Sequence, residues 1–596
     1  MINIAKLRDK HAIVSLGNYQ PVLQSILDFD YMIGRKRSSL VAIVTAGIHN
    51  QKLFFGTREI LIPCAQDIKE LKDLEIPPPD LFLNLNSGRR AKDSTKEFIE
   101  AFPKVLGGHI FAENVPEQHA IYLYQKFHDK HFIAGPSGVG LMLPGHLKLG
   151  AVGGTDWRQL VASKLYASGS VAVLSASGGM INELIRMVAN GGNGCSFALT
   201  LGGDRFPITS PGEALLAAEA DPQTKVILYY GELGGYDEYD IIELVKAGRV
   251  KKPIIAYIAG NVGEAFARPV QFGHAKALAA RPPESASAKR RALKKAGVKV
   301  ADSIASLADF VEALRGDILP KMPQRDPQQL SSRQPGLITT TISDEKEVYE
   351  FVGKSLEDWE KNHSLVEMIV AGLLGRPAHS KLLVQCSESI FKLALDHGPN
   401  VSGAVNTIVT ARAGRDMVSS LSAGLLTIGP RYGGAGNDAA RIWFDAVQSG
   451  MDAKELVESY AKNKRYILGI GHKKYNLSQP DPRVTRLLEF VKDLPERPYT
   501  DFAKAVVAIT SSKKSNLILN FDGAFAAVLL DILQQSEKLK PREIAQLIDS
   551  EFFNAYFVIP RAVGFISHFL DQKRLDEGLF RLPDSQVTVI PTQKTD

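Results

Sequence analysis

Histidines and carboxylates in glycine-containing turns are the residues of this chain best suited to chemistry. In the C-terminal half, His397 stands in the sequence DHGP, His472 in GIGH and Asp522 in NFDG. Glycine disfavours a helix, so polar residues gathered in such turns indicate a site. Two imidazoles and a carboxylate around an acyl carbon can supply an acid or base and a donor to a carbonyl oxygen. Making or breaking a carbon–carbon bond beside a thioester requires those groups.

A second candidate is His274, in the sequence GHA, which follows the predicted strand KPIIAYIAG. We expect it near a helix N-terminus and strand-end glycines, where free amides and the helix dipole favour bound phosphate. A neutral imidazole at this place can accept a phosphoryl group. Glu183, in SGGMINEL, and Glu232, in GELGG, follow strand ends of the same predicted sheet and could orient the ring. The alternatives are a capping or core histidine and, for Glu183, a solvent-exposed residue favoured by the helix dipole.

Cationic side chains could bind anionic substrates near these turns. Arginines can hold carboxylates through bidentate hydrogen bonds, although a single arginine is more often a surface ion-pair partner. Lysines could contact the phosphates of a coenzyme, although lysine pairs are usually solvated surface. The candidates are Arg483, Arg561 and Arg581 for carboxylates, and Lys473, Lys513 and Lys514 for phosphates. The sequence contains no metal-ligand spacing, Walker A motif or GxGxxG fingerprint, so we expect no metal site and no unaided binding of ATP.

The N-terminal half predicts the elements that position His274. Short β-rich runs such as SLVAIVTAG, SVAVLSASGG and CSFALTLGG recur with room for a helix between them, which predicts parallel sheets covered on both faces. Several strands end in small residues, Gly202 and Gly203 among them, at the sheet edge where ligands bind. The segment PGHLKLGAVGGTD interrupts the rhythm, so we expect two sheet domains, over residues 1–150 and 151–315.

The C-terminal half is of a different kind. Residues 316–340 contain PKMPQRDPQQLSSRQP, which is rich in Pro, Gln and Ser and predicts an extended linker. From residue 341 to 596, apolar residues recur at spacings of three and four, as in KLLVQCSESIFKLALDHG. This spacing predicts a helical domain.

Composition excludes several classes of protein. The chain has 596 residues, 45% hydrophobic and 23% charged, which is typical of a globular protein. A net charge of +6 is too small for the basic surface that binds nucleic acid. Three widely separated cysteines fit neither a metal cluster nor a disulfide framework and indicate a reducing compartment. No signal core or membrane-length apolar stretch occurs, so we expect a cytoplasmic protein without membrane contact.

The motifs around these residues resemble those of known families. FGHA, SASGGMINEL, LGGDRFP and GELGG resemble the α subunit of succinyl-CoA synthetase, whereas DHGPNVSGAVNTIVTARAG, GIGHKKYNLSQPDPRV, SSKKSNLILNFDG and HFLDQKRLDEGLFR resemble citrate synthase. In this order the two modules resemble the C-terminal half of the ATP-citrate lyase family, over residues 13–581. The resemblance implies two α/β parallel-sheet domains, a Rossmann-like CoA-binding domain and a flavodoxin-like CoA-ligase domain, followed by an all-α citrate synthase-like domain.

The resemblance also implies a reaction and its partners. A partner ATP-grasp subunit of the β type would phosphorylate His274 with Mg-ATP, with Glu183 and Glu232 supporting the ring and Gly202 and Gly203 near the citrate and phosphate site. The phosphoryl group would pass to citrate, CoA would displace it, and the C-terminal domain would cleave citryl-CoA to acetyl-CoA and oxaloacetate. Self-association through the citrate synthase-like domain is implied as well.

In the C-terminal domain the resemblance gives each residue a role. Asp522 would be the base on the citryl hydroxyl, His397 the donor to the thioester oxygen and His472 the donor to the carbonyl that becomes oxaloacetate. The residues that would hold the carboxylates of citrate or oxaloacetate are Arg483, Arg561 and Arg581, the last by reaching into a neighbouring protomer.

One residue departs from the family's pattern. The family has Gly-His-Ala-Gly-Ala at the phosphohistidine, and this chain has Lys276 at the fourth position, where it could contact phosphate or disturb a tight turn. One alternative is therefore a citryl-CoA lyase or a citrate-forming ligase–synthase fusion whose ligase half is altered. Another is a non-catalytic scaffold that binds CoA, although a scaffold has no physical need for the two histidines, the aspartate and the three arginines.

Overall fold

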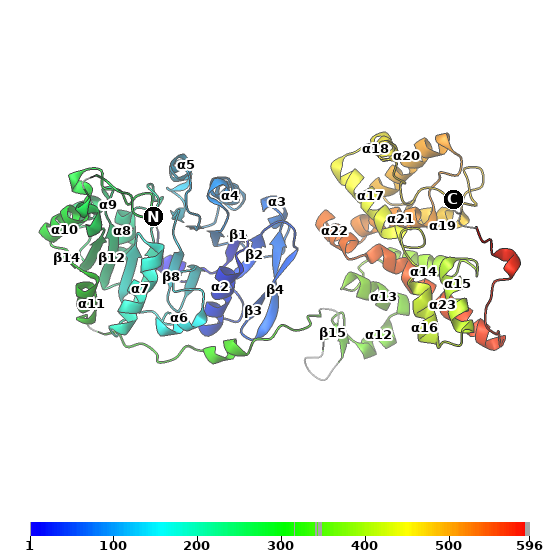
Figure 1. Ribbon diagram of the computed structural model, residues 1–596, viewed down its shortest axis with the longest axis horizontal. Coiled ribbons are helices and arrows are strands. Elements are labelled where there is room, and N and C mark those ends of the chain that lie inside the picture. Colours follow the sequence, from blue (N-terminus) through cyan, green and yellow to red (C-terminus); the bar gives the residue numbers. More distant parts are fainter. Residues whose placement is uncertain (1, 267, 315, 340–341, 344–348, 591–596) are drawn as a thin grey trace, which may run out of the picture. The chain divides into compact units, whose positions relative to one another are not determined.

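The computed structural model describes residues 2–266, 268–314, 316–339, 342–343 and 349–590. The chain divides into two compact units, Met1–Leu337 (unit 1) and Ile338–Asp596 (unit 2), which Figure 1 colours by sequence. Unit 1 contains two mainly parallel sheets and unit 2 is mainly helical, which confirms the predicted fold class. Within the described ranges, no helix is both long and apolar enough to span a bilayer.

The first sheet of unit 1 has seven strands in the order β3-β4-β2-β1-β5-β6-β7. Its strands are β1 (Ile13–Leu16), β2 (Leu40–Val44), β3 (Asn50–Phe55), β4 (Arg58–Ala65), β5 (Leu81–Asn84), β6 (Gly107–Ile110) and β7 (Phe132–Ala134). All neighbours are parallel except β3 and β4, which form an antiparallel hairpin at the edge. The six parallel strands therefore have the order of a Rossmann-like sheet.

The second sheet also has seven strands, in the order β14-β13-β12-β10-β11-β8-β9. Its strands are β8 (Gly140–Leu143), β9 (Leu147–Gly150), β10 (Val171–Ser175), β11 (Cys195–Thr200), β12 (Val226–Glu232), β13 (Ile254–Ala259) and β14 (Lys299–Val300). The five parallel strands have the flavodoxin-like order. The β8–β9 hairpin extends this sheet, with β8 antiparallel to β11. The predicted domain boundary at residue 150 is therefore too late, because β8 and β9 belong to the second sheet.

Helices cover both faces of each sheet in unit 1. Along β10, Ala172 and Leu174 pack in one core and Val173 in another, because side chains alternate along a strand. The helices are α2 (Gln20–Met32), α3 (Ile68–Leu71), α4 (Gly88–Ala101) and α5 (Glu117–Phe127) on the first sheet, α7 (Gly178–Asn190) and α11 (Ile304–Glu312) on one face of the second, and α8 (Pro211–Ala220), α9 (Asp237–Lys246) and α10 (Ala286–Lys295) on the other. Further helical elements are α1 (Ile4–Leu7), α6 (Trp157–Ala162), η1 (Asn261–Ala265) and η2 (Pro282–Glu284).

The predicted linker, residues 316–340, is not a free spacer over most of its length. Residues up to Leu337 belong to unit 1, and the short helix η3 (Pro327–Ser332) buries Leu330. The guanidinium of Arg333 forms an ion pair with the buried Asp28 of α2. The Tyr166 hydroxyl donates to the carbonyl of Lys321 over 3.0 Å. A segment rich in Pro, Gln and Ser can thus lie along a surface when single side chains anchor it.

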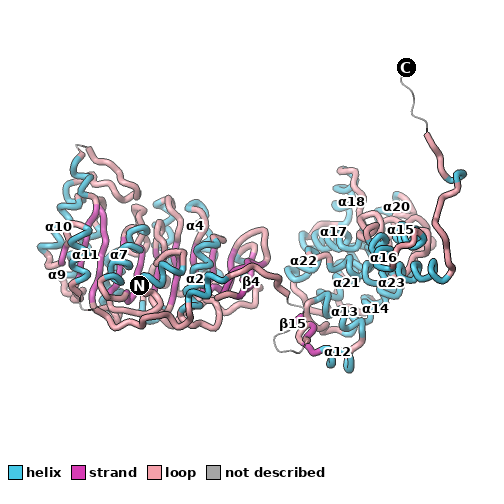
Figure 2. The backbone as a smooth tube through the Cα atoms, turned by 60° about the horizontal axis from the view of Figure 1, so that its bottom comes forward, coloured by secondary structure: helices cyan, strands magenta, loops and turns pink. Residues whose placement is uncertain are grey.

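Unit 2 is a bundle of helices preceded by a small sheet, so it is not purely helical. The short antiparallel strands are β15 (Ile342–Ser343), β16 (Glu350–Phe351) and β17 (Lys354–Ser355). The helices are α12 (Leu356–Asn362), α13 (Leu365–Leu374), α14 (Lys381–Ala394), α15 (Ser402–Arg412), α16 (Met417–Leu425), α17 (Ala435–Ser449), α18 (Ala453–Lys462), α19 (Pro482–Leu488), η4 (Glu489–Val491), α20 (Pro498–Lys513), α21 (Phe521–Gln535), α22 (Pro541–Asp549), α23 (Phe552–Arg574) and η5 (Asp584–Gln586). Figure 2 shows α21 running among the others.

The helix α21 forms the centre of unit 2. Every residue from Gly523 to Leu533 is buried, which is the pattern of a helix enclosed on all sides. The helices α14, α17, α19, α20 and α22 pack around it. Because α21 is fixed in this way, Asp522 in its first turn has a rigid support.

Candidate active sites

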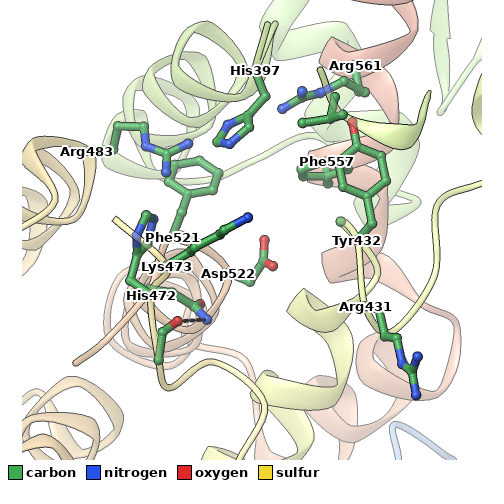
Figure 3. A pocket seen from close by; sticks show the side chains of 14 residues that line it. His397, Arg431, Tyr432, His472, Lys473, Arg483, Phe521, Asp522, Phe557 and Arg561 are labelled. Carbon is green, nitrogen blue, oxygen red and sulfur yellow. Dashed lines mark hydrogen bonds between the residues drawn. The ribbon is translucent and has the colours of Figure 1, made fainter. Parts of the chain in front are cut away.

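A pocket of about 270 Å³ in unit 2 contains the three residues that the sequence singled out there. Its walls come from the turns before α15, α17 and α21, from the segment between α18 and α19, and from α19, α21 and α23 (Figure 3). The lining residues are His397, Val401, Arg431, Tyr432, Gly433, Gly471, His472, Lys473, Arg483, Asn520, Phe521, Asp522, Phe557 and Arg561. The structure thus brings together two imidazoles, one carboxylate and three arginines from segments far apart in the sequence.

His472 is held as a neutral imidazole with a defined tautomer. Its Nδ1 accepts hydrogen bonds from the backbone N–H groups of Lys474 and Tyr475, both over 3.0 Å. An accepting Nδ1 carries no proton, so the proton of the neutral ring is on Nε2. Burial and the positive charges of Arg483 and Lys474 lower the pKa of His472, although Asp481 opposes them. The ring therefore offers an Nε2–H donor at neutral pH.

His397 is also a neutral imidazole, and burial is again the main cause. Burial lowers its pKa, and the charges of Arg483 and Arg561 lower it further, although the charge of Asp396 opposes them. Its turn is fixed by Asp396, whose carboxylate accepts from the N–H of Gly398 over 3.0 Å. Figure 3 shows the His397 ring directed into the pocket from above. Two neutral imidazoles can donate to oxygen atoms of a bound substrate without adding positive charge.

Asp522 is the carboxylate of this pocket. It lies at the start of α21, where Asn520 caps the helix by accepting from the N–H of Gly523 over 3.0 Å. Burial raises the pKa of Asp522 to about 6, although the charges of Arg483 and Arg561 lower it. A carboxylate with a raised pKa is a stronger base than an exposed aspartate and still ionised at neutral pH.

Arg483 and Arg561, the two pocket arginines that the sequence singled out, differ in how they are held. Asp481 binds the Arg483 guanidinium through Nε at 3.1 Å and Nη2 at 2.7 Å. Arg561 is 1% exposed, and its Nε and Nη1 have no hydrogen-bond partner in the described part of the chain. Buried donors without a partner are costly. A carboxylate bound in the pocket would satisfy them.

The other cationic candidates lie outside this constellation or at its rim. Lys473 lines the pocket. Lys513 and Lys514, at the end of α20, are exposed and are not part of the lining. Arg581 is exposed in the segment after α23 and does not line the pocket of its own chain either.

The sequence reasoning missed Tyr432, which lines the pocket. Its phenol oxygen is buried and has no hydrogen-bond partner within the described ranges, and burial raises its pKa against the opposing charge of Arg561. Tyr432 lies in the run GPRYGGAG, in which the two glycines that follow it mark a turn. That turn was the available signal.

In unit 1 the structure brings His274 and Glu232 together. The His274 Nδ1 lies 2.9 Å from one carboxylate oxygen of Glu232 and 3.1 Å from the other. A Cβ on Gly203 would lie 2.4 Å from Cγ of the His274 ring, so the ring packs against glycine backbone. Gly202 has φ +108°, and the carbonyl oxygen of Pro136 occupies the space that a Cβ at this position would need. Glu232 ends β12 and the two glycines follow β11, as expected for a site at the carboxyl ends of strands.

Two further carboxylates act on His274. The pKa of His274 is raised, first by its hydrogen bond to Glu232 and then, against the effect of burial, by the charges of Glu232, Glu113 and Asp204. Glu113 follows β6 and Asp204 follows Gly203, so both stand after strand ends, which was the signal for them in the sequence. Glu183 contributes nothing of this kind: its side chain is 53% exposed and pairs with Arg186 on the same helix.

The prediction that a helical segment begins at His274 is wrong. His274 occupies a turn between η1 and η2, and the next α-helix begins at Ala286. Lys276 fits this turn without a left-handed backbone, and its ammonium forms an ion pair with Asp237. The lysine that replaces the family's glycine therefore does not disturb the turn.

Two family models match the chain, and together with the fold they define its class. The CoA-ligase model matches residues 174–308, and the model "Citrate synthase, C-terminal domain" matches residues 291–582. The ATP-citrate synthase subunit 1 of Sordaria macrospora is 36% identical over 95% of this chain and 87% of its own. Human ATP-citrate synthase is 38% identical over 96% of this chain and 54% of its own, so this chain spans about half the length of the animal relatives. The chain belongs to the ATP-citrate synthase family.

Two solved structures are similar to nearly the full length of the chain. The ATP citrate lyase of Methanosaeta concilii, in complex with (3S)-citryl-CoA, is 32% identical, covers 98% of both chains and has a TM-score of 0.51. A second one, from Methanothrix soehngenii in complex with citrate and coenzyme A, has a TM-score of 0.50 at the same identity.

Proposed function

We propose that this chain, with an ATP-grasp partner subunit, cleaves citrate with CoA and ATP to acetyl-CoA and oxaloacetate. Unit 1 would carry the ligase steps and unit 2 the cleavage of citryl-CoA. Family membership supports the overall reaction, and the citryl-CoA bound to the Methanosaeta protein supports the intermediate. The complementary chemistry of the two sites supports the division of labour.

In the ligase half, His274 accepts the γ-phosphoryl group of Mg-ATP held by the partner. With Nδ1–H donated to Glu232, the lone pair of the ring is on Nε2, which is then the nucleophile. Nε2 forms a bond to phosphorus as the bond to the ADP oxygen breaks. A citrate carboxylate next takes the phosphoryl group, and the CoA thiolate displaces phosphate from citryl phosphate to give citryl-CoA.

In the lyase half, Asp522 takes the proton of the citryl hydroxyl as the carbon–carbon bond to the thioester-bearing carbon breaks. The electron pair moves into the thioester to form an enolate, to which His397 donates, while His472 donates through Nε2–H to the oxygen that becomes the ketone of oxaloacetate. Asp522 then returns the proton to the enolate carbon to give acetyl-CoA. Arg483 and Arg561 hold the substrate's carboxylates, and Lys473 at the rim contacts CoA phosphate.

Exposed apolar side chains support two associations. Val262, Phe266 and Val270 are exposed in the segment that leads to His274, where an ATP-grasp partner must reach the ring. In unit 2, Val418 on α16 and Val563 on α23 are exposed on a pair of helices that pack together. We assign the first surface to the partner subunit and the second to a second copy of this chain, which would also bring Arg581 to a neighbouring site.

The His274–Glu232 contact carries the proposal for the ligase half. The test is incubation of the chain with its ATP-grasp partner and Mg-ATP labelled in the γ-phosphate, without citrate. We expect an acid-labile label on the wild type that is absent from His274→Ala and is discharged by citrate plus CoA. An unlabelled wild type that still cleaves citryl-CoA would show a lyase with an altered ligase half.

A further inference from the structure

The turn that carries His274 is closed on itself and on the neighbouring glycines. The N–H of Phe272 donates to the carbonyl of Ala277 over 3.0 Å, and the N–H of Ala277 donates to the carbonyl of His274 over 3.1 Å. The N–H of Lys276 donates to the carbonyl of Gly203 over 3.3 Å. The backbone of this turn thus contacts the same glycine on which the imidazole rests.

The side chain of Lys276 fastens this turn to a second segment. It is 9% exposed and ends in the ion pair with Asp237, the first residue of α9. On its way it passes Gly235, where a Cβ would lie 3.2 Å from Cε of the lysine. Gly234 has φ +91°, and a Cβ there would lie 2.0 Å from the Lys276 carbonyl. The two glycines that follow Glu232 therefore leave the room through which Lys276 reaches Asp237.

The charges around Lys276 make its ammonium depend on the ion pair with Asp237. Lys289 is fully buried, donates to the carbonyl of Glu232 over 2.9 Å and pairs with Glu238 at 2.6 Å. Burial and the charge of Lys289 lower the pKa of Lys276 to about 8, while the charge of Glu232 opposes them. An ammonium in such surroundings depends on Asp237, and removal of either partner leaves a poorly solvated charge.

We propose that the Lys276–Asp237 ion pair is a latch that holds the His274 turn beside β12, so that the imidazole stays on the Glu232 carboxylate. Lys276 is on this account a positioning residue, since its ammonium points to Asp237 and not to the ring. The proposal rests on the proposed function only for the phosphoryl-accepting role of His274. A fixed Nδ1 contact keeps Nε2 in one orientation for transfer.

The test measures the imidazole itself and needs no partner subunit. Potassium phosphoramidate transfers its phosphoryl group to a neutral imidazole and releases ammonia, so the pH midpoint of His274 phosphorylation, followed by peptide mass, reports the pKa of His274. The groups that face the ring in the structure are Glu232, Glu113 and Asp204. The variants are Lys276→Met, Asp237→Asn, the double variant and the control Lys246→Met, which breaks an exposed pair with Glu243 on the same helix α9.

For Lys276→Met, the latch predicts a change in the pH midpoint that is opposite in sign to the change expected from the lost charge alone. Lys276→Met removes a positive charge, which by itself would raise the midpoint, whereas loss of the Glu232 contact lowers it. We expect the midpoint to fall in Lys276→Met and in Asp237→Asn, with no further fall in the double variant and none in Lys246→Met. We also expect the labelled chain to discharge to citrate about tenfold more slowly in both single variants.

An unchanged or raised midpoint in Lys276→Met would overturn the proposal. Thermal unfolding of each variant separates a local effect from loss of the fold, and Lys276→Gly, which restores the family's residue, gives a second variant with the same expected fall. If the wild type is not labelled by Mg-ATP and the partner but the midpoints move as expected, the proposed function fails and the latch stands.

Discussion

Gly203→Ala separates the two halves of the proposed reaction. The backbone of Gly203 is not left-handed, so alanine is tolerated there, but its Cβ would lie 2.4 Å from Cγ and 2.8 Å from Nδ1 of His274. Real Cβ atoms do not approach so closely, so the ring has to move. The movement removes the hydrogen bond between His274 and Glu232. The three atoms nearest to this Cβ all belong to His274.

The magnitude follows from the lost contact. A hydrogen bond to a charged group contributes about 1.5–3 kcal/mol, which corresponds to a roughly ten- to hundredfold change in rate. We expect labelling of His274 by Mg-ATP and the partner subunit to slow by that factor. Citryl-CoA cleavage, measured on the same preparation, should stay within about twofold of the wild type.

The matched control is Gly179→Ala. Gly179 is exposed near the start of α7, and a Cβ there meets nothing within 4 Å. Alanine at this position should leave both activities unchanged, since it also favours the helix. Labelling of Gly203→Ala at the wild-type rate would refute the reasoning, because the ring could then not depend on its place against this glycine.

Three further changes test other parts of the account. Because burial raises the pKa of Asp522 to about 6, the rate of citryl-CoA cleavage should fall as the pH drops through 6, where the protonated carboxyl no longer accepts the hydroxyl proton. Arg8→Ala leaves the buried Asp221, held at 2.7 and 2.9 Å, without its guanidinium, and should lower the free energy of unfolding of unit 1 in urea by about 3–5 kcal/mol. Glu183→Gln should leave labelling of His274 unchanged, because this exposed carboxylate pairs with Arg186 on its own helix.

The fold could be predicted where strands are short, apolar and followed by glycine. The β8–β9 hairpin escaped this reasoning, because all its residues are buried and its turn lies within a run of glycines and prolines. A buried hairpin has no alternation of polar and apolar residues to reveal it. The docked linker escaped for another reason, since its anchors, such as the ion pair of Arg333 with Asp28, join residues that are far apart in the sequence.

The candidate sites could be predicted in part. Turn glycines pointed to the residues of the unit 2 pocket, and strand ends pointed to Glu232. Periodicity cannot tell which of several strand-end carboxylates faces a given ring, so Glu183 was included and Glu113 and Asp204 were missed. The direction of the Lys276 side chain depends on Gly234 and Gly235, which lie 42 and 41 residues earlier in the sequence and meet it only after folding.

Cleavage of citryl-CoA by the purified chain tests the central claim most directly. Oxaloacetate is followed with malate dehydrogenase and NADH, for the wild type, for Asp522→Asn and for Asp501→Asn, an exposed aspartate on α20 that serves as the matched control. We predict turnover by the wild type and the control, and a rate roughly a hundredfold or more lower in Asp522→Asn. A folded wild type that releases no oxaloacetate, or an Asp522→Asn variant as fast as the wild type, would contradict the assignment of this pocket as the lyase site.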